Sequence, residues 1–178
     1  MAMWTENPDI PVTGEDGLPL VPLIGLGTPL FDQIHVIAMT TCSVSSVVSM
    51  TILIYMFRTM SRSFWRCTTG ERLVVYLSIC DLFYSFSHGI DHAIIYATHN
   101  FTPQPACSVL AWFTQQFVLA QSLVVNIAAV TAVVIIVREK RVSFGKYDLF
   151  LIAWAFGLPA VLGAVAGATQ LLGPIGAW

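Results

Sequence analysis

Charged residues occupy few places in this chain, and long stretches with almost no charge separate them. All eight basic residues fall into two groups, one over residues 58–72 and the other over residues 138–146. Each of the four stretches around these groups exceeds the about 20 helical residues that cross the roughly 30 Å hydrocarbon core of a bilayer. The chain is therefore predicted to cross a membrane four times.

The composition excludes an ordinary soluble domain. Of the 178 residues, 56% are hydrophobic and 10% are charged, whereas about 25% charged residues are typical of globular proteins. The apolar runs are continuous over more than twice the roughly ten residues of a barrel strand, which favours helices over a transmembrane barrel. We expect an all-α membrane protein. Because the sequence contains no nucleophile elbow and no metalloprotease motif, we expect no enzymatic activity.

The positions of the basic residues predict an orientation. Lys and Arg in short loops are retained on the cytoplasmic side of a membrane. The expected transmembrane helices span residues 33–57, 72–98, 107–137 and 147–172, and the basic loops 58–71 and 138–146 between them are expected in the cytoplasm. Both chain ends then lie outside, together with the loop 99–106 and the start of a further outer loop at 173–178.

One of the expected outer segments supports this orientation independently. Asn100 begins the sequence Asn100-Phe101-Thr102, an acceptor for N-glycosylation, and such acceptors are used only on the outer side. Residues 1–32 combine five acidic residues with five prolines, a pattern that favours neither a helix nor a packed core. This segment is predicted to be a disordered extracellular arm.

Ionisable residues in the second expected helix require an explanation, because a charge in the membrane is costly unless it faces protein or water. Asp81, Ser85, His88 and His92 recur at intervals of four, three and four residues, which places them on one helical stripe. Asp91 lies beside that stripe. Two interpretations stay open: a buried polar seam satisfied by neighbouring helices, and a water-filled pocket or ion site.

The third expected helix offers polar partners for Asp81. Gln115, Ser122 and Asn126 share a face through their spacing of seven and four residues, and Gln121 adds another carboxamide. A buried carboxylate needs hydrogen-bond donors, and we favour Gln121 or Asn126 for that role. The same side chains would also serve as fasteners between helices, each worth about 1 kcal/mol.

The spacing of His88, Asp91 and His92 allows these side chains to approach one metal ion. A zinc site needs three or four ligands, however, and the third and fourth expected helices contain no histidine. His35 in the first helix would join only if the helices happened to pack that way. We expect no metal and no cofactor, haem included. A pH-sensing role for the two histidines of the second helix is a further hypothesis.

The fourth expected helix combines a proline with a row of small residues. Pro159 frees a backbone carbonyl and is expected to kink the helix. Gly163 and Gly167 are separated by three residues and interleaved with alanines, a pattern that permits close approach of another helix. The partner is the second helix, the third helix or another copy of the chain.

The order of several features resembles the first half of a seven-helix G-protein-coupled receptor. These features are a basic first loop, the run Leu77-Ser78-Ile79-Cys80-Asp81-Leu82, a cysteine at the outer start of the third helix, and the pattern Trp154-x-x-Gly157-x-Pro159. More narrowly, the chain looks like the cyclic-AMP-receptor-like and secretin-like branches. The resemblance covers residues from about 33 to 178. The inner end of the third helix lacks the acidic-Arg-aromatic triplet of rhodopsin-like receptors.

The resemblance implies a disulfide from Cys107 to a cysteine in the loop after the fourth helix. The chain ends at Trp178 without such a cysteine, so we expect a fragment or truncated form of a receptor. The resemblance further implies an outward-facing ligand pocket lined by His88, Asp91, His92, Thr114 and Gln115.

The resemblance also implies partners and a location. The basic loops would face a heterotrimeric G protein, an extracellular ligand would bind the pocket, and the protein would lie in the plasma membrane. No nucleic acid is expected as a partner. The alternative is a self-contained four-helix membrane protein, such as a channel or transporter subunit or an assembly partner, with the Asp81 stripe as its polar path.

Overall fold

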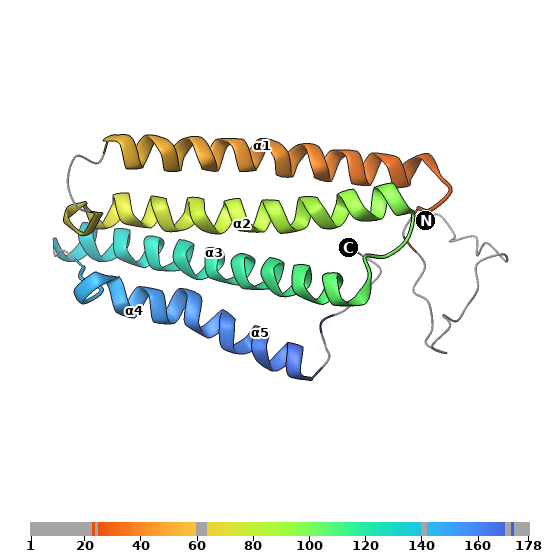
Figure 1. The fold of residues 1–178 in the computed structure, drawn as a ribbon. Coiled ribbons are helices and arrows are strands. Elements are labelled where there is room, and N and C mark those ends of the chain that lie inside the picture. The colour runs from red at the N-terminus through yellow and green to blue at the C-terminus, as the bar shows by residue number, and fades with distance from the viewer. Residues whose placement is uncertain (1–22, 24, 60–63, 140–141, 170–171, 173–178) are drawn as a thin grey trace.

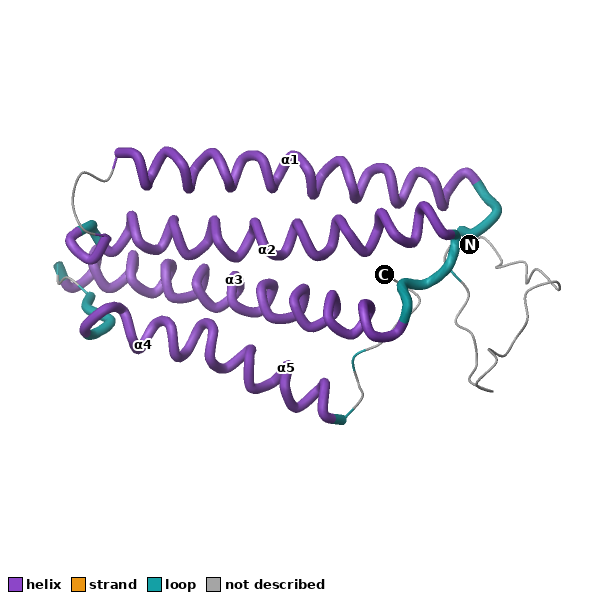
Figure 2. The backbone as a smooth tube through the Cα atoms, viewed as in Figure 1, coloured by secondary structure: helices purple, strands orange, loops and turns teal. Residues whose placement is uncertain are grey.

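The computed structural model describes residues 23, 25–59, 64–139, 142–169 and 172. Four helical segments are long and apolar enough to cross a membrane, and they lie side by side with alternating direction (Figure 1). Helices and loops make up the described part of the chain, without strands (Figure 2). The predicted all-α class and the four membrane-crossing segments are confirmed.

The first three helices are α1 (Pro29–Thr59), α2 (Thr69–Thr98) and α3 (Gln104–Arg138). The fourth begins with a short 3-10 turn at Lys146–Asp148 and continues through α4 (Leu149–Ile152), a π-helical turn (Ala153–Gly157) and α5 (Leu158–Ala168). α1 therefore starts within the predicted N-terminal arm, whose residues 1–22 and 24 lie outside the described residues. The predicted loop at 173–178 also lies outside them.

The start of α2 is fixed by a capping box. The Glu71 backbone N–H donates to the Thr68 hydroxyl over 3.3 Å, and the Thr68 N–H donates to the Glu71 carboxylate over 2.7 Å. These reciprocal bonds satisfy backbone donors that the first helical turn leaves without a partner. The helix therefore begins three residues before the predicted start at Arg72.

A wider helical turn lies where the sequence predicts a kink in the fourth helix. The π-helical turn Ala153–Gly157 ends two residues before the buried Pro159. A proline has no N–H to continue the α-helical hydrogen-bond ladder, and π turns are one of the ways in which a helix accommodates this. Trp154 lies in this turn and is exposed.

Helices that are neighbours in the sequence are neighbours in space. α1 packs on α2, α2 packs on α3, and α3 packs on the π-helical turn and α5. A buried apolar cluster near the basic loops joins α2, α3 and the fourth helix; it consists of Leu73, Tyr76, Val124, Leu151 and Ala155. Sequential packing of this kind leaves one face of α1 open to lipid.

Close packing of the small residues is confirmed at Gly163. A Cβ atom on Gly163 would lie 2.6 Å from Nε1 of Trp112 in α3, which is closer than real Cβ contacts allow. The partner that the sequence left open is therefore the third helix at this position. At Gly167, the nearest atom to such a Cβ belongs to Leu172, at 3.7 Å.

The outer faces of the helices carry large apolar side chains. Ile37 of α1, Ile136 of α3 and Phe150 of α4 are each more than half exposed. In water such a surface would be unfavourable, whereas lipid tails match it. The chain is a multi-pass integral membrane protein whose outer faces contact the bilayer.

Candidate functional site

The carboxylate of Asp81 lies between α1 and α2. Ser45 donates a hydrogen bond of 2.7 Å to Asp81 Oδ2, and Ser49 donates to the same oxygen. Ser49 is buried and Asp81 is half-buried. Two hydroxyl donors thus stabilise an acidic group in the interior of the bundle.

The donors come from α1, and not from α3 as we favoured from the sequence. Gln121 is half-buried on α3, whereas Ser122 and Asn126 are exposed, and the Ser122 hydroxyl donates to the backbone carbonyl of Val118 over 2.9 Å. The spacing of residues predicts the stripe on α2, but it cannot tell which neighbouring helix the stripe faces. Asp81 and His92 both contact α1, so the stripe faces that helix.

Three histidines form a chain across the same interface. Nδ1 of His35 in α1 lies 2.7 Å from Nδ1 of His92 in α2, and Nε2 of His92 lies 3.2 Å from Nε2 of His88. Phe31 packs edge-on against His35 with ring centroids 4.4 Å apart, and Tyr84 stacks on His88 at 5.4 Å. The sequence grouped His88 with His92, and the structure adds His35.

The geometry of these histidines is that of a chain and not of a chelate. His92 uses its two ring nitrogens, which point in different directions, for its two neighbours. A single metal ion requires ligand nitrogens that converge on one point. Among the described residues, no group of three histidine, cysteine or acidic side chains is placed to hold a metal ion.

Asp91 contacts the loop that leads to α3. The Thr102 hydroxyl donates to Asp91 Oδ1 over 2.7 Å, and Thr102 is buried. Thr102 is also the third residue of the predicted glycosylation acceptor, whose Asn100 is exposed and donates from Nδ2 to the Thr98 carbonyl. The folded chain therefore presents the asparagine of this acceptor and buries its threonine.

The remaining residues of the predicted ligand pocket lie on α3. The Thr114 hydroxyl contacts the Ser87 hydroxyl of α2 at 3.2 Å, and Gln115 is half-buried. Ser85, from the α2 stripe, is buried. The neighbouring Gln116, which the sequence did not single out, is buried and donates from Nε2 to the Phe156 carbonyl of the π-helical turn over 3.0 Å.

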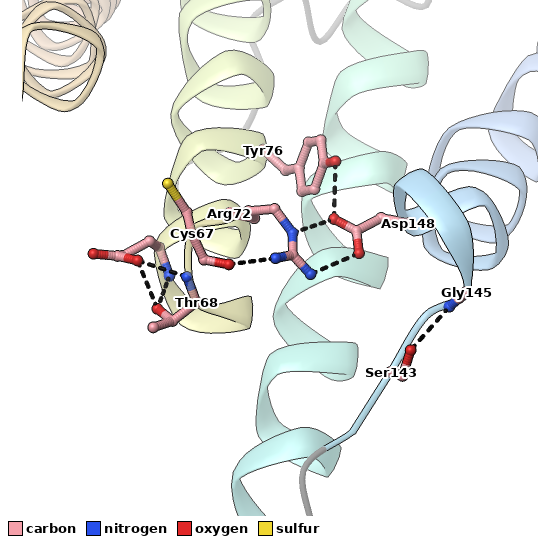
Figure 3. Close-up of polar contacts among 8 residues, drawn as sticks. Cys67, Thr68, Arg72, Tyr76, Ser143, Gly145 and Asp148 are labelled. Atoms are coloured by element: carbon pink, nitrogen blue, oxygen red, sulfur yellow. Dashed lines mark hydrogen bonds and ion pairs between the residues drawn. The ribbon is translucent and has the colours of Figure 1, made fainter. Parts of the chain in front are cut away.

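A second polar site lies at the opposite end of α2. Arg72 donates from Nε to Asp148 Oδ2 over 2.5 Å and from Nη2 to Asp148 Oδ1 over 2.8 Å, forming a bidentate ion pair (Figure 3). Tyr76 also donates to Asp148 over 3.2 Å, and Arg72 donates to the carbonyl of Cys67. This group of residues ties α2 to the start of the fourth helix.

The backbone around Asp148 is strained. Tyr147 and Asp148 have positive φ angles of 60° and 52°, a region that costs L-residues roughly 1–2 kcal/mol each. Gly145, with φ of 83°, lies two residues before them and adopts its conformation without that cost. The sequence interpretation treated Arg72 only as a topology signal and overlooked Asp148; an acidic residue in the first turn of an apolar helix was the available signal.

All four cysteines are free. Cys42 and Cys80 are buried, while Cys67 and Cys107 are half-buried. The disulfide of Cys107 that the resemblance implies is not found, and it stays a prediction from that resemblance.

The chain matches no model of a known protein family and no curated protein. Its function must therefore be inferred from the geometry. Two of the groups of polar contacts include side chains of α2: one joins α2 to α1, and the other joins it to the start of the fourth helix.

Proposed function

We propose that this chain acts in a membrane receptor of the seven-helix, G-protein-coupled type, where it carries the signal of an extracellular ligand toward a heterotrimeric G protein. The observation that carries the proposal is the pair of polar connections made by α2. One connects α2 to α1 through His92 and Asp81, and the other connects it to the fourth helix through Arg72.

These connections suit a helix that transmits movement. We call the end of the bundle that holds His35, His88 and His92 the histidine end. A ligand that binds there and favours one placement of α2 over another shifts the equilibrium between the two placements. Because α2 is a continuous helix, its other end moves with it. At that end, the movement of α2 moves Arg72 relative to Asp148, its partner in the ion pair beside the strained turn that begins the fourth helix. Small helix shifts of this kind are an established mode of switching.

The orientation that we propose follows the basic residues. The loops that contain Arg66 and Lys146 lie at the same end of the bundle as the ion pair, and we place this end in the cytoplasm of a cell whose plasma membrane holds the protein. The histidine end and Asn100 then face outward, where a polar or charged ligand has access.

The test is capture of G protein by the full chain. The tagged chain is purified in mild detergent from membranes that contain heterotrimeric G protein, with and without the non-hydrolysable nucleotide GTPγS. We expect G protein to be retained and then released by the nucleotide. Replacing the exposed Arg66 and Arg138 by glutamate should reduce retention, whereas His99→Asn at the opposite end should leave it unchanged. No retention, or retention that ignores both the nucleotide and the charge reversal, contradicts the proposal.

A second candidate function is a self-contained four-helix channel or transporter subunit, or an assembly partner. It is favoured by the placement of the histidine chain and of Asp81 along one helix interface, which would supply a polar path. In this case Asp81→Asn should change the conductance of the chain reconstituted in a planar bilayer, while Ser43→Ala on the exposed face of α1 should not. Equal currents in the unmodified protein and in both variants, or no current in any of them, count against this candidate.

A further inference from the structure

The three histidines between α1 and α2 form hydrogen bonds with one another. Each contact joins two ring nitrogens, at 2.7 Å for His35 with His92 and at 3.2 Å for His92 with His88. His35 and His92 are 5% and 7% exposed, so water competes little for these nitrogens. A neutral imidazole has one N–H donor and one bare acceptor nitrogen. In the neutral chain His92 therefore donates to one neighbour and accepts from the other.

Two arrangements of hydrogens satisfy the neutral chain. In one, His92 donates through Nδ1 to His35 and accepts at Nε2 from His88. In the other, both directions are reversed. One added proton also fits, because a doubly protonated His92 donates to both neighbours. The proton arrives at the outer nitrogen of an end ring. The charge can stay on that ring, which then donates to His92, or the hydrogen on its inner nitrogen can shift to His92.

A second added proton does not fit. It would place an N–H group opposite another N–H group in one of the two contacts, and two positive charges would then lie on adjacent rings in a poorly solvated interface. Relief would require the rings to separate. Since His35 belongs to α1 and His92 to α2, that separation would open this end of the α1–α2 interface.

The surroundings of the chain bear on its charge. Two carboxylates lie close to these rings along the sequence: Asp91 directly precedes His92 on α2, and Asp32 precedes His35 by three residues on α1. The described Lys and Arg residues lie at the opposite end of the bundle. Other titratable groups nearby, among the described residues, are Tyr84, which stacks on His88, Tyr96, which packs near His35, His99, which stacks on Phe31, and Cys107, which lies near Asp91.

We infer that the row of His35, His92 and His88 is a binding site that takes up at most one solvent proton while both of its contacts persist. The hydrogen-bond accounting gives this capacity, and it allows the charge on any of the three rings. This inference does not depend on the proposed receptor function, because it concerns only the contacts between α1 and α2.

The test counts charged rings in the full chain. The protein is labelled with nitrogen-15 in its histidines and held in lipid nanodiscs, and its imidazole nitrogen spectra are recorded from about pH 8 to about pH 4, a range that brackets ordinary histidine titration. We expect one of the three rings to become imidazolium in a first step. A second should follow only at a pH lower by about one unit or more, as for coupled sites. Three rings that become charged together near about pH 6.5 would overturn the inference.

Two variants test the coupling of the rings. His92→Ala removes the middle ring and with it both contacts, so His35 and His88 should then become charged independently of each other. His99→Asn changes an exposed histidine outside the row of three, at a left-handed position that asparagine tolerates, and the stepwise titration should remain. Persistence of the stepwise titration in His92→Ala would also overturn the inference. If that variant does not fold, the count in the unmodified protein decides alone.

Discussion

Arg72 and Asp148 are 76 residues apart in the sequence and form a bidentate ion pair between the second and fourth membrane helices. Their side chains are 14% and 3% exposed, so the pair is largely removed from solvent. Asp148 adopts a left-handed backbone conformation, and the ion pair is one of the interactions that hold it there. This contact joins α2 to the fourth helix where the latter begins.

The first prediction concerns this ion pair. Asp148→Asn leaves the Arg72 guanidinium without its counter-charge, and loss of one partner of a buried pair costs about 3–5 kcal/mol. We expect the free energy of unfolding, measured by denaturant titration in mixed micelles, to fall by that amount. Replacing Arg72 by methionine together with Asp148 by leucine should recover most of the loss, because no lone charge remains. A loss below about 1 kcal/mol in Asp148→Asn would contradict the assignment.

The second prediction concerns the donors to Asp81. Ser49→Ala removes a buried hydroxyl that donates to this carboxylate. We expect a loss of about 1–2 kcal/mol in the same unfolding measurement, at the upper end of the range for hydrogen bonds between membrane helices, because the acceptor is a carboxylate. Ser43→Ala on the exposed face of α1 is the matched control and should have little effect. If the two variants lowered the free energy of unfolding equally, the hydrogen bond from Ser49 to Asp81 would contribute no measurable stability of its own.

The third prediction concerns the contact of the fourth helix with α3. A methyl group at Gly163 would lie 2.6 Å from Nε1 of Trp112, so the ring or the helix must shift. We expect Gly163→Ala to destabilise the bundle by about 1–3 kcal/mol, as overpacking of a tight interface does. Gly167→Ala meets only ordinary contact with Leu172 at 3.7 Å and should be close to neutral. An unchanged stability in Gly163→Ala would show that the interface yields freely.

The sequence predicted the presence and approximate bounds of the helices well, because the length and hydropathy of a segment depend on that segment alone. The stripe from Asp81 to His92 was also predictable, since it depends only on helical spacing. The end of the fourth helix was predicted less accurately: it lies at Ala168 in the structure, whereas the sequence predicted residue 172. The cap formed by Thr68 and Glu71, by contrast, was readable in the sequence and would have placed the start of α2 correctly.

Contacts between helices were harder to predict, because one sequence does not specify how a helix rotates against its neighbours. The donors to Asp81 were assigned to α3 for its carboxamides, whereas the structure has them on α1. His35 joined the other histidines through the same undetermined rotation. Asp148 was overlooked because its partner lies in a distant segment, and only the fold brings Arg72 to it.

The fourth prediction tests the proposed orientation. We expect Asn100 to be glycosylated when the chain is synthesised into microsomes, and we expect an acceptor sequence appended to the C-terminus to be modified as well. Since the folded chain buries Thr102 against Asp91, modification at Asn100 must precede folding of that loop. Asp91→Asn, which weakens this contact, should therefore raise the modified fraction. Asn100→Gln should abolish glycosylation at residue 100 without affecting glycosylation of the appended acceptor.

An acceptor sequence placed at residues 142–145, in the basic loop, is the control for the opposite side and should stay unmodified. The readout is the shift in electrophoretic mobility that endoglycosidase removes. Modification in the basic loop together with an unmodified C-terminus would reverse the orientation. The histidine end would then face the cytoplasm, and the ion pair of Arg72 with Asp148 would lie at the outer surface.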